Sequence, residues 1–298
     1  MDEKPMYFEA NLQQSHWLRR GLLLSAAIAA TGALVAVPAQ AQPILPFGLG
    51  SGSSAPAVAE PAPAVAQFAP PNINIADGET VGVAQPIVIS FKEPIEDRAA
   101  AERAIKVTSS ANAPGHFYWT SSKQVRWKPY EFWPANTDVT VVAGGTSSSF
   151  HIGDAFVATV DDATKMIVVT RNGEVVREMP TSLGKPGYET PNGTYIVGER
   201  LEKMTMDSST YGVPVTDPEG YKLEVEYATR LSNSGIFIHA APWSVGQQGY
   251  SNASHGCLNV STADGKWFLE NSRRGDAVVV TGTQGGTLSS GDGLGDWN

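Results

Sequence analysis

The chain has 298 residues, of which 42% are hydrophobic and 17% charged, with a formal net charge of -9. This is room for about two domains with buried cores, and the acidic balance argues against nucleic-acid binding, which needs a basic face to displace counterions from phosphates. The single cysteine, Cys257, excludes an intramolecular disulfide framework and any multi-cysteine zinc or iron–sulfur site.

Residues 1–41 have the pattern of an export signal. Arg19 and Arg20 precede an apolar run over 21–37, and Ala39 and Ala41 give the small-x-small pattern that signal peptidase requires. We expect cleavage after Ala41; the alternative is an uncleaved signal anchor, with 21–37 held in the membrane. Either outcome predicts an exported protein of the periplasm or cell wall, at the outer face of the cytoplasmic membrane.

Residues 42–71 are rich in proline and alanine, which predicts a semi-rigid linker. The next segment, 72–152, contains about seven short β-rich runs separated by turn residues, which indicates an immunoglobulin-like sandwich. Its tryptophans and phenylalanines suit either a ligand platform or the sandwich core, and composition favours the core. The runs cover 73–75, 86–91, 104–107, 117–119, 125–127, 139–143 and 149–152.

Residues 153–283 form a second β-rich domain. The runs 165–170 and 174–179 flank Asn172-Gly173, which predicts a hairpin with a type I′ turn. Apolar and charged residues alternate from Tyr221 to Tyr227, so this strand is expected to have one buried face and one solvated face. An apolar strand follows at 235–239 and ends in His239.

One short helix is expected in this domain. Ser261 can cap a helix that runs to about Ser272, with Asp264 favourable in its first turn. Gly275 ends it, and a strand follows at 277–281. Residues 284–298 are rich in glycine and serine, which predicts a tail that is disordered or laid along the surface, with Trp297 as its anchor.

The stretch from 235 to 259 carries the residues that suit catalysis. A cysteine attacks carbonyls as its thiolate, so it needs an imidazole nearby to lower its pKa or to take its proton. Only His239 and His255 share a domain with Cys257, and the loop between 239 and 257 is long enough to return the chain beside the first strand. Gly256 permits close backbone approach, and we expect the N–H groups of Gly256 and Cys257 to face an oxyanion.

Two other interpretations of these residues stay open. His255 and Cys257 are two residues apart, so on a strand they share a face and with His239 would make a zinc site with an open position. Alternatively, the cysteine is buried and inert beside two core histidines.

The spacing of these residues matches a known pattern. His239, fourteen further residues and then Ser-His-Gly-Cys-Leu-Asn at 254–259 resemble the signature of the L,D-transpeptidase (YkuD-type) catalytic domain. Segments 206–214, 241–246 and 293–297 resemble the actinobacterial, mycobacterial-type members, which carry an export signal and immunoglobulin-like domains. Over 72–298, the resemblance implies a mainly β fold: an immunoglobulin-like β-sandwich followed by a β-rich YkuD-type catalytic domain with a short helix.

The resemblance also implies roles for individual residues. Cys257 matches the nucleophile and His239 the general base, which the carbonyl of the next residue orients; this is Ala240, where the family commonly has serine. His255, with Gly256 beside it, matches a histidine that organises the site. The matched substrate contacts are Tyr221, Ser234, Gly235 and Asn259, and the matched lid residues are Met206, Tyr211 and Trp243.

The implied activity is acyl transfer on peptidoglycan. The expected partners are stem peptides: a donor tetrapeptide that loses its terminal D-alanine to form a thioester, and an acceptor amine that completes a 3→3 cross-link. The resemblance further implies acylation by carbapenem-type β-lactams, with no metal and no organic cofactor. Two alternatives stay open, an L,D-carboxypeptidase that uses the same nucleophile and a non-enzymatic wall-binding spacer protein.

Overall fold

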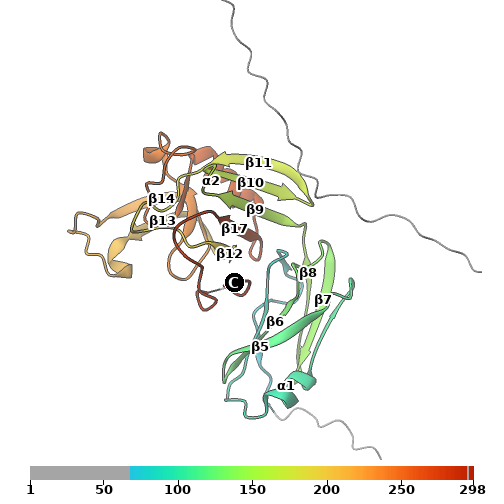
Figure 1. Cartoon of the computed structure of the whole chain (residues 1–298). Helices are drawn as coiled ribbons and strands as arrows, with labels where there is room; N and C mark the ends of the chain where they lie inside the picture. The colour runs from blue at the N-terminus through green and yellow to red at the C-terminus, as the bar shows by residue number, and fades with distance from the viewer. Residues whose placement is uncertain (1–67, 294) are drawn as a thin grey trace, which may run out of the picture. The chain divides into compact units, whose positions relative to one another are not determined.

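The computed structural model describes residues 68–293 and 295–298 (Figure 1). The predicted export signal and nearly all of the predicted linker therefore lie outside the described residues. Within the described part of the chain, no helix is both long and apolar enough to cross a membrane.

The first domain is a sandwich of two four-stranded sheets, as the sequence predicts. One sheet has the strand order β1-β3-β6-β5 and the other β2-β8-β7-β4, and all pairs are antiparallel except β2 with β8. The elements are β1 (Asn72–Ile73), β2 (Thr80–Val81), β3 (Ile87–Ser90), α1 (Arg98–Ala104), β4 (Ile105–Ser109), β5 (Gly115–Ser121), β6 (Gln124–Pro129), β7 (Thr137–Ala143) and β8 (Thr146–Ile152).

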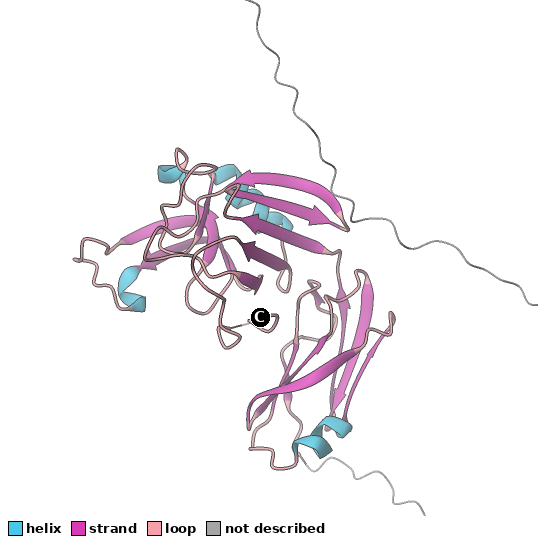
Figure 2. Cartoon of the chain, viewed as in Figure 1, coloured by secondary structure: helices cyan, strands magenta, loops and turns pink. Residues whose placement is uncertain are grey.

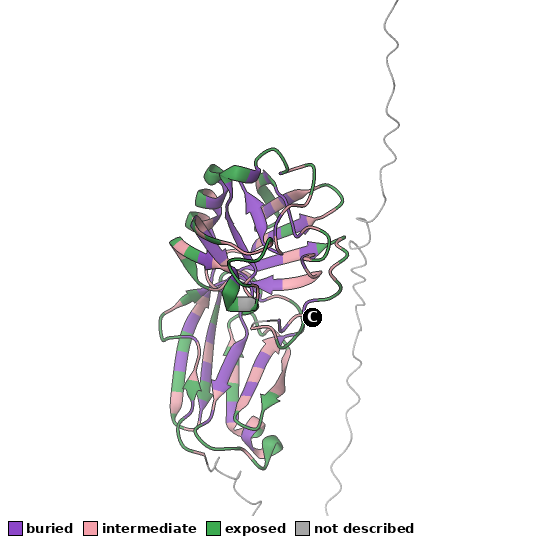
Figure 3. Ribbon diagram, turned by 90° about the vertical axis from the view of Figure 1, so that its left-hand side faces the viewer, coloured by how far each residue is buried: buried purple, intermediate pink, exposed green. Residues whose placement is uncertain are grey.

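The aromatic residues of the sandwich belong mainly to its core. Alternate residues of β6 and β7 are buried because successive side chains of a strand point to opposite faces. Figure 3 shows this alternation of buried with less buried residues along strands of the sandwich. The rings of Trp127 and Trp133 lie 5.0 Å apart, and the indole N–H of Trp133 donates to the carbonyl of Gln85 at 2.9 Å. These two tryptophans therefore serve packing rather than a ligand platform.

The sandwich also contains a helix that the sequence interpretation missed. Helix α1 begins after Asp97, whose carboxylate accepts the N–H of Ala100 at 2.8 Å, and it contains three consecutive alanines. An aspartate cap followed by strong helix formers is a helix signal. The predicted strand at 104–107 consequently begins one residue later, at Ile105.

The second domain is built on two further sheets (Figure 2). A five-stranded sheet has the order β11-β10-β9-β17-β12, and a four-stranded sheet has the order β13-β14-β15-β16. The elements are β9 (Phe156–Asp161), β10 (Met166–Arg171), β11 (Glu174–Pro180), β12 (Gly193–Ile196), β13 (Arg200–Asp207), η1 (Ser208–Tyr211), β14 (Lys222–Arg230), β15 (Phe237–Ala240), η2 (Pro242–Ser244), β16 (Leu258–Val260), α2 (Thr262–Asn271) and β17 (Ala277–Thr281). The predicted mainly β fold is confirmed; residues 68–293 and 295–298 contain two short α-helices, α1 and α2, where one was expected.

Two local sequence signals in this domain predicted the structure correctly, a hairpin turn and a helix cap. The hairpin β10–β11 turns at Asn172 and Gly173, whose φ values of 52° and 88° are those that a type I′ turn requires. Helix α2 is capped by Ser261, whose hydroxyl accepts the N–H of Asp264 at 3.1 Å. Both predictions are confirmed.

Strand β14 departs from its predicted alternation. The pattern holds to Val225, which is buried, but Tyr227 has φ 51° and the next buried residue is Ala228. Tyr227 is left out of the ladder with β13, although the register is the same on both sides of it, and the buried position passes from 227 to Ala228. The prediction that Tyr227 continues the buried face is therefore wrong.

The C-terminal tail lies along the surface, the second of the two expected alternatives. The indole N–H of Trp297 donates to the carbonyl of Ala84 at 2.8 Å, and its ring packs edge-on against Phe132 at 4.8 Å. Leu288 is buried in the core of the second domain. The anchoring role of Trp297 is confirmed.

Candidate active site

Parallel pairing of β15 and β16 brings the strand that carries His239 beside the chain segment that carries Cys257. Ile238 pairs with Leu258 and His239 with Asn259, so Cys257 immediately precedes the strand that lies beside β15. Helix α2 packs directly on β15 because Gly265 lacks a side chain: a Cβ there would lie 2.9 Å from the backbone nitrogen of Ala240. The histidine is thus carried by a buried strand that is held on two sides.

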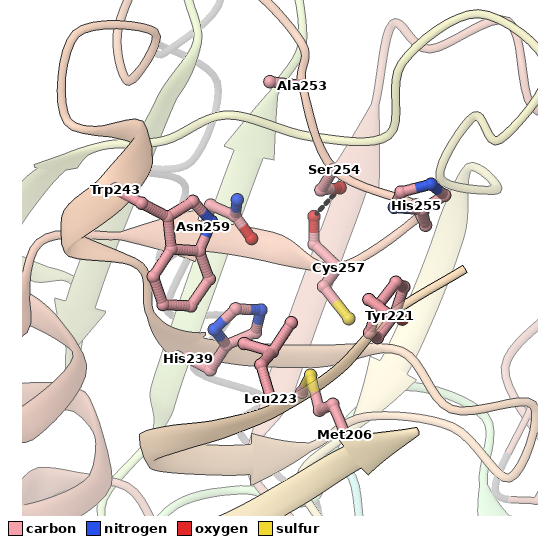
Figure 4. A pocket seen from close by; sticks show the side chains of 10 residues that line it. All are labelled: Met206, Tyr221, Leu223, His239, Trp243, Ala253, Ser254, His255, Cys257 and Asn259. Carbon is pink, nitrogen blue, oxygen red and sulfur yellow. Dashed lines mark hydrogen bonds between the residues drawn. The ribbon is translucent and has the colours of Figure 1, made fainter. Parts of the chain in front are cut away.

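A cavity of about 210 Å³ opens beside Cys257. In Figure 4 the cysteine sulfur lies between the ring of His239 on one side and Tyr221 and His255 on the other. The lining residues are Met206, Tyr221, Leu223, His239, Trp243, Ala253, Ser254, His255, Cys257 and Asn259.

The thiol of Cys257 is protonated at rest. The residue is 8% exposed, and burial raises the pKa of its thiol to about 11. The sulfur lies 3.6 Å from the carbonyl oxygen of Gly235, to which the S–H donates. The sequence is compatible with two ways of activating the thiol, a lowered thiol pKa or removal of its proton by a base. The raised pKa of Cys257 favours removal by a base.

His239 has the tautomer that a general base requires. Its Nδ1 lies 2.9 Å from the carbonyl oxygen of Ala240. A carbonyl only accepts, so Nδ1 carries the proton and Nε2 carries the lone pair. Burial lowers the pKa of the imidazole below its ordinary value of 6.5, so the ring is neutral at pH 7. The expected orienting role of the carbonyl at 240 matches this hydrogen bond, with alanine in place of serine.

The loop that precedes Cys257 is held by buried hydroxyl groups. Ser254 Oγ donates to the carbonyl of Cys257 at 2.6 Å and accepts the N–H of Gly256 at 3.1 Å. Thr190 Oγ1 donates to the carbonyl of Gly256 at 2.8 Å. Gly256 has φ 117°, a conformation that side chains rarely adopt.

This bonding corrects one expectation. The N–H of Gly256 is directed at Ser254, so it does not face an oxyanion beside Cys257. The serine side chain competes for the loop N–H, as Ser and Thr hydroxyls commonly do in turns. Of the two backbone donors expected from the sequence, the N–H of Cys257 is the one that stays a prediction.

His255 lines the cavity and has partners outside it. Its Nε2 is 2.8 Å from a carboxylate oxygen of Glu219, and its ring contacts those of Tyr188 and Tyr221, with centroids at 4.6 and 5.3 Å. Within the described residues, no group of three or more His, Cys, Asp or Glu side chains is placed to hold a metal ion. The zinc alternative therefore has no ligand cluster in this geometry.

Apart from Tyr211, the predicted substrate-contact and lid residues are divided between this cavity and a neighbouring one. Asn259 lines the cavity and donates to Ser244 Oγ at 3.1 Å, and Met206, Tyr221 and Trp243 also line it. Ser234 does not: its hydroxyl donates to Asp292 at 2.5 Å, and it lines a neighbouring cavity of about 390 Å³. That cavity shares Met206 and Tyr221 with the first. The side chain of Tyr211 lies outside the described part of the structure.

Sequence reasoning missed three residues that build the site. Thr190 and Glu219 lie far from Cys257 in sequence and no local pattern marks them. Ser254 was part of the matched motif, but its two hydrogen bonds to Gly256 and Cys257 were not predicted.

Comparison with known proteins identifies the family of both domains. The L,D-transpeptidase catalytic domain family matches residues 155–280, and a bacterial Ig domain family matches 62–145. L,D-transpeptidase 1 of Mycobacterium tuberculosis is 41% identical over 223 residues, which cover 75% of this chain and 87% of the relative. The chain belongs to the L,D-transpeptidase family.

Further relatives support the assignment. L,D-transpeptidase 2 of Mycobacterium tuberculosis is 50% identical over 242 residues, covering 76% of this chain and 59% of that protein. The chain thus spans less than two thirds of the length of this relative. A solved structure of the L,D-transpeptidase LdtMt1 in complex with imipenem has a TM-score of 0.67 and 41% identity, covering 74% of this chain and all of that one. A structure of L,D-transpeptidase 3 in complex with a faropenem-derived adduct has a TM-score of 0.66 at 37% identity, covering 72% and 99%.

Proposed function

We propose that this protein is a peptidoglycan L,D-transpeptidase that forms 3→3 cross-links through a thioester on Cys257. The observation that carries the proposal is the pairing of a buried thiol with a neutral imidazole around one cavity, where Nδ1 of His239 is occupied by the carbonyl of Ala240. The free lone pair on Nε2 is what a general base needs. Membership of the family supplies the substrate class.

The first half-reaction forms the acyl-enzyme. His239 Nε2 takes the proton from Cys257 as the sulfur attacks the amide carbonyl carbon between the third residue of a donor tetrapeptide and its terminal D-alanine. Proton transfer accompanies attack because the thiol pKa is raised and the imidazole pKa is lowered. The imidazolium then gives this proton to the D-alanine nitrogen, the C–N bond breaks, and a thioester remains.

The second half-reaction transfers the acyl group. The side-chain amine of a second stem, on a diamino acid such as meso-diaminopimelate, attacks the thioester carbonyl. Its excess proton returns through His239 to the departing sulfur, so that an amide forms and the thiol is restored. We assign oxyanion stabilisation to the N–H of Cys257, with the hydroxyl of Tyr221 beside the reacting carbonyl. Asn259, Trp243 and Met206 line the cavity that would hold the substrate.

The same thioester can be attacked by water, which would make the protein an L,D-carboxypeptidase. Incubation of the mature chain with disaccharide-tetrapeptide and analysis of the muropeptides by mass spectrometry separates the two activities. Cross-linked dimers support transfer, and tripeptide monomers alone would replace it by hydrolysis. Neither product from wild-type protein would reject both and favour the wall-binding spacer.

Two consequences reach beyond the reaction. We expect covalent acylation of Cys257 by carbapenem-type β-lactams, supported by the imipenem complex and the faropenem-derived adduct of two relatives. We also keep the expectation of export to the cell wall, with 1–41 as a cleaved signal or an anchor. A mature N-terminus at Gln42, found by N-terminal sequencing of secreted protein, would support cleavage.

A further inference from the structure

The carboxylate of Glu219 joins three separate chain connections beside His255, which lines the cavity. Glu219 belongs to the β13–β14 connection (208–221), which also contributes Tyr221 to the cavity lining. The same oxygen, Oε2, receives His255 Nε2 at 2.8 Å from the β15–β16 connection and Lys185 Nζ from the β11–β12 connection. These contacts link segments that are 34 and 36 residues apart in sequence.

Tyr188 contacts both partners of Glu219, His255 and Lys185. The ring of Tyr188 meets the edge of His255 at 4.6 Å, and the ammonium group of Lys185 lies 5.3 Å from the same tyrosine ring. Hydrogen bonds from Lys185 and then from His255 hold the pKa of Glu219 below its ordinary value of 4.5. Glu219 is therefore ionised at neutral pH and only accepts, so Nε2 of His255 must carry a proton.

The backbone around Glu219 is held by hydrogen bonds within its own connection, independently of Lys185 and His255. Its N–H donates to the side chain of Asp217 at 2.9 Å, and the N–H of Gly220 donates to the carbonyl of Asp217 at 2.8 Å. Ser208 and Tyr221 exchange hydrogen bonds of 2.9 Å at the base of the connection. A preformed turn therefore presents the carboxylate to the loop that carries the nucleophile two residues after His255.

We propose that Glu219 is a positioning residue with two effects. It keeps the proton of the neutral His255 ring on Nε2, and it holds the β13–β14 connection in place over the acyl-enzyme. This inference rests on the proposed function and concerns the fate of the thioester. With the connection held in place, Tyr221 keeps its position in the cavity wall and the amine acceptor competes against little water. With it released, water gains access and hydrolysis increases.

The first test compares products. Wild-type chain, Glu219→Ala, Glu219→Gln and the matched control Glu224→Ala, which removes a carboxylate paired with Lys203 at 3.4 Å on the outer face of β14, are incubated with disaccharide-tetrapeptide. In Glu219→Ala the ratio of tripeptide to dimer is expected to rise about fivefold. Glu219→Gln keeps an acceptor oxygen for His255 and is expected to restore most of the wild-type ratio.

The outcomes distinguish the two levels of the proposal. An active wild type with Glu219→Ala indistinguishable from Glu224→Ala would overturn the role of Glu219 and leave the proposed function intact. A wild type that gives neither dimer nor tripeptide would remove the proposed function itself.

The second test needs no substitution, so it stands even if Glu219→Ala fails to fold. Nitrogen NMR of histidine-labelled wild-type protein is expected to show His255 with its proton on Nε2. The tautomer with the proton on Nδ1 alone would overturn the proposal, because it cannot donate to Glu219.

Discussion

Replacing Thr190 by valine tests whether buried hydroxyl groups hold the nucleophile loop. Thr190 is fully buried, and its Oγ1 accepts the N–H of Gly184 at 3.1 Å and donates to the carbonyl of Gly256 at 2.8 Å. Valine has the same shape, so the substitution opens no cavity, but it leaves one backbone donor and one backbone acceptor buried without this partner.

An orphaned buried polar group costs about 1–3 kcal/mol, so Thr190→Val is expected to lower the free energy of unfolding by about 3 kcal/mol. Gly256 directly precedes Cys257, so the sulfur also loses part of its fixed position. A displacement of a reacting atom by a fraction of an ångström lowers rates strongly, and we expect acylation of Cys257 to slow by about tenfold.

Two assays check this expectation. Urea-induced unfolding gives the change in stability, and the rate of acylation by imipenem, followed by intact mass, gives the change in reactivity. The control is Thr108→Val on the exposed face of β4, where the hydroxyl makes only a 3.4 Å contact and valine suits a strand. A free energy of unfolding for Thr190→Val within about 0.5 kcal/mol of the wild-type value would refute the reasoning, because surface substitutions without a structural role fall in that range. An unchanged acylation rate would also refute it.

Three further outcomes are expected. The apparent rate constant for acylation should fall only on the acid side, with an apparent pKa below 6.5, because His239 must be neutral to accept a proton and burial lowers its pKa; a midpoint above 6.5 in the pH–rate profile would contradict this. Gly235→Ala should lower the free energy of unfolding by about 1 kcal/mol and slow acylation, because φ is 99° at this residue and its carbonyl accepts the hydrogen bond of the thiol. The control is Gly246→Ala, at an open position with no left-handed φ. Equal urea unfolding midpoints for the two variants would argue against the strain at Gly235. Burial raises the pKa of Asp276 from 3.8 to about 7, so its unfavourable ionisation removes about 4 kcal/mol of stability as the pH rises from 4 to 7, with no further loss above; Asp276→Asn should remove this dependence, and identical urea midpoints against pH for both proteins would exclude it.

Local chemistry explains why much of the second domain could be predicted. Asn172-Gly173 dictates its turn because both residues adopt positive φ at little cost, and Ser261 marks a helix start because its hydroxyl satisfies a free N–H. The pairing of His239 with Cys257 followed from a strand, a returning loop and the spacing of a long motif. The turn and helix signals lie within short stretches of sequence, where one or two residues decide the outcome.

The features that escaped prediction depend on contacts between distant segments. Glu219 lies in a connection with no motif, and only folding places it beside His255. The resting state of Cys257 follows from how deeply it is buried, which no neighbour in the sequence determines. The left-handed residue Tyr227 was unforeseeable because tyrosine normally suits an extended strand. Helix α1 is different, since the cap at Asp97 and the alanine run were visible and were outweighed by the surrounding strand pattern.

The claim on which the mechanism depends is that the sulfur of Cys257 carries the acyl group. Peptide mapping by mass spectrometry after incubation of the full chain with imipenem tests it directly, with Cys257→Ala analysed in parallel. We predict one adduct per chain, confined to the peptide that contains Cys257 and absent from the variant. An adduct on another residue, or an adduct that persists in Cys257→Ala, would contradict the assignment of the nucleophile.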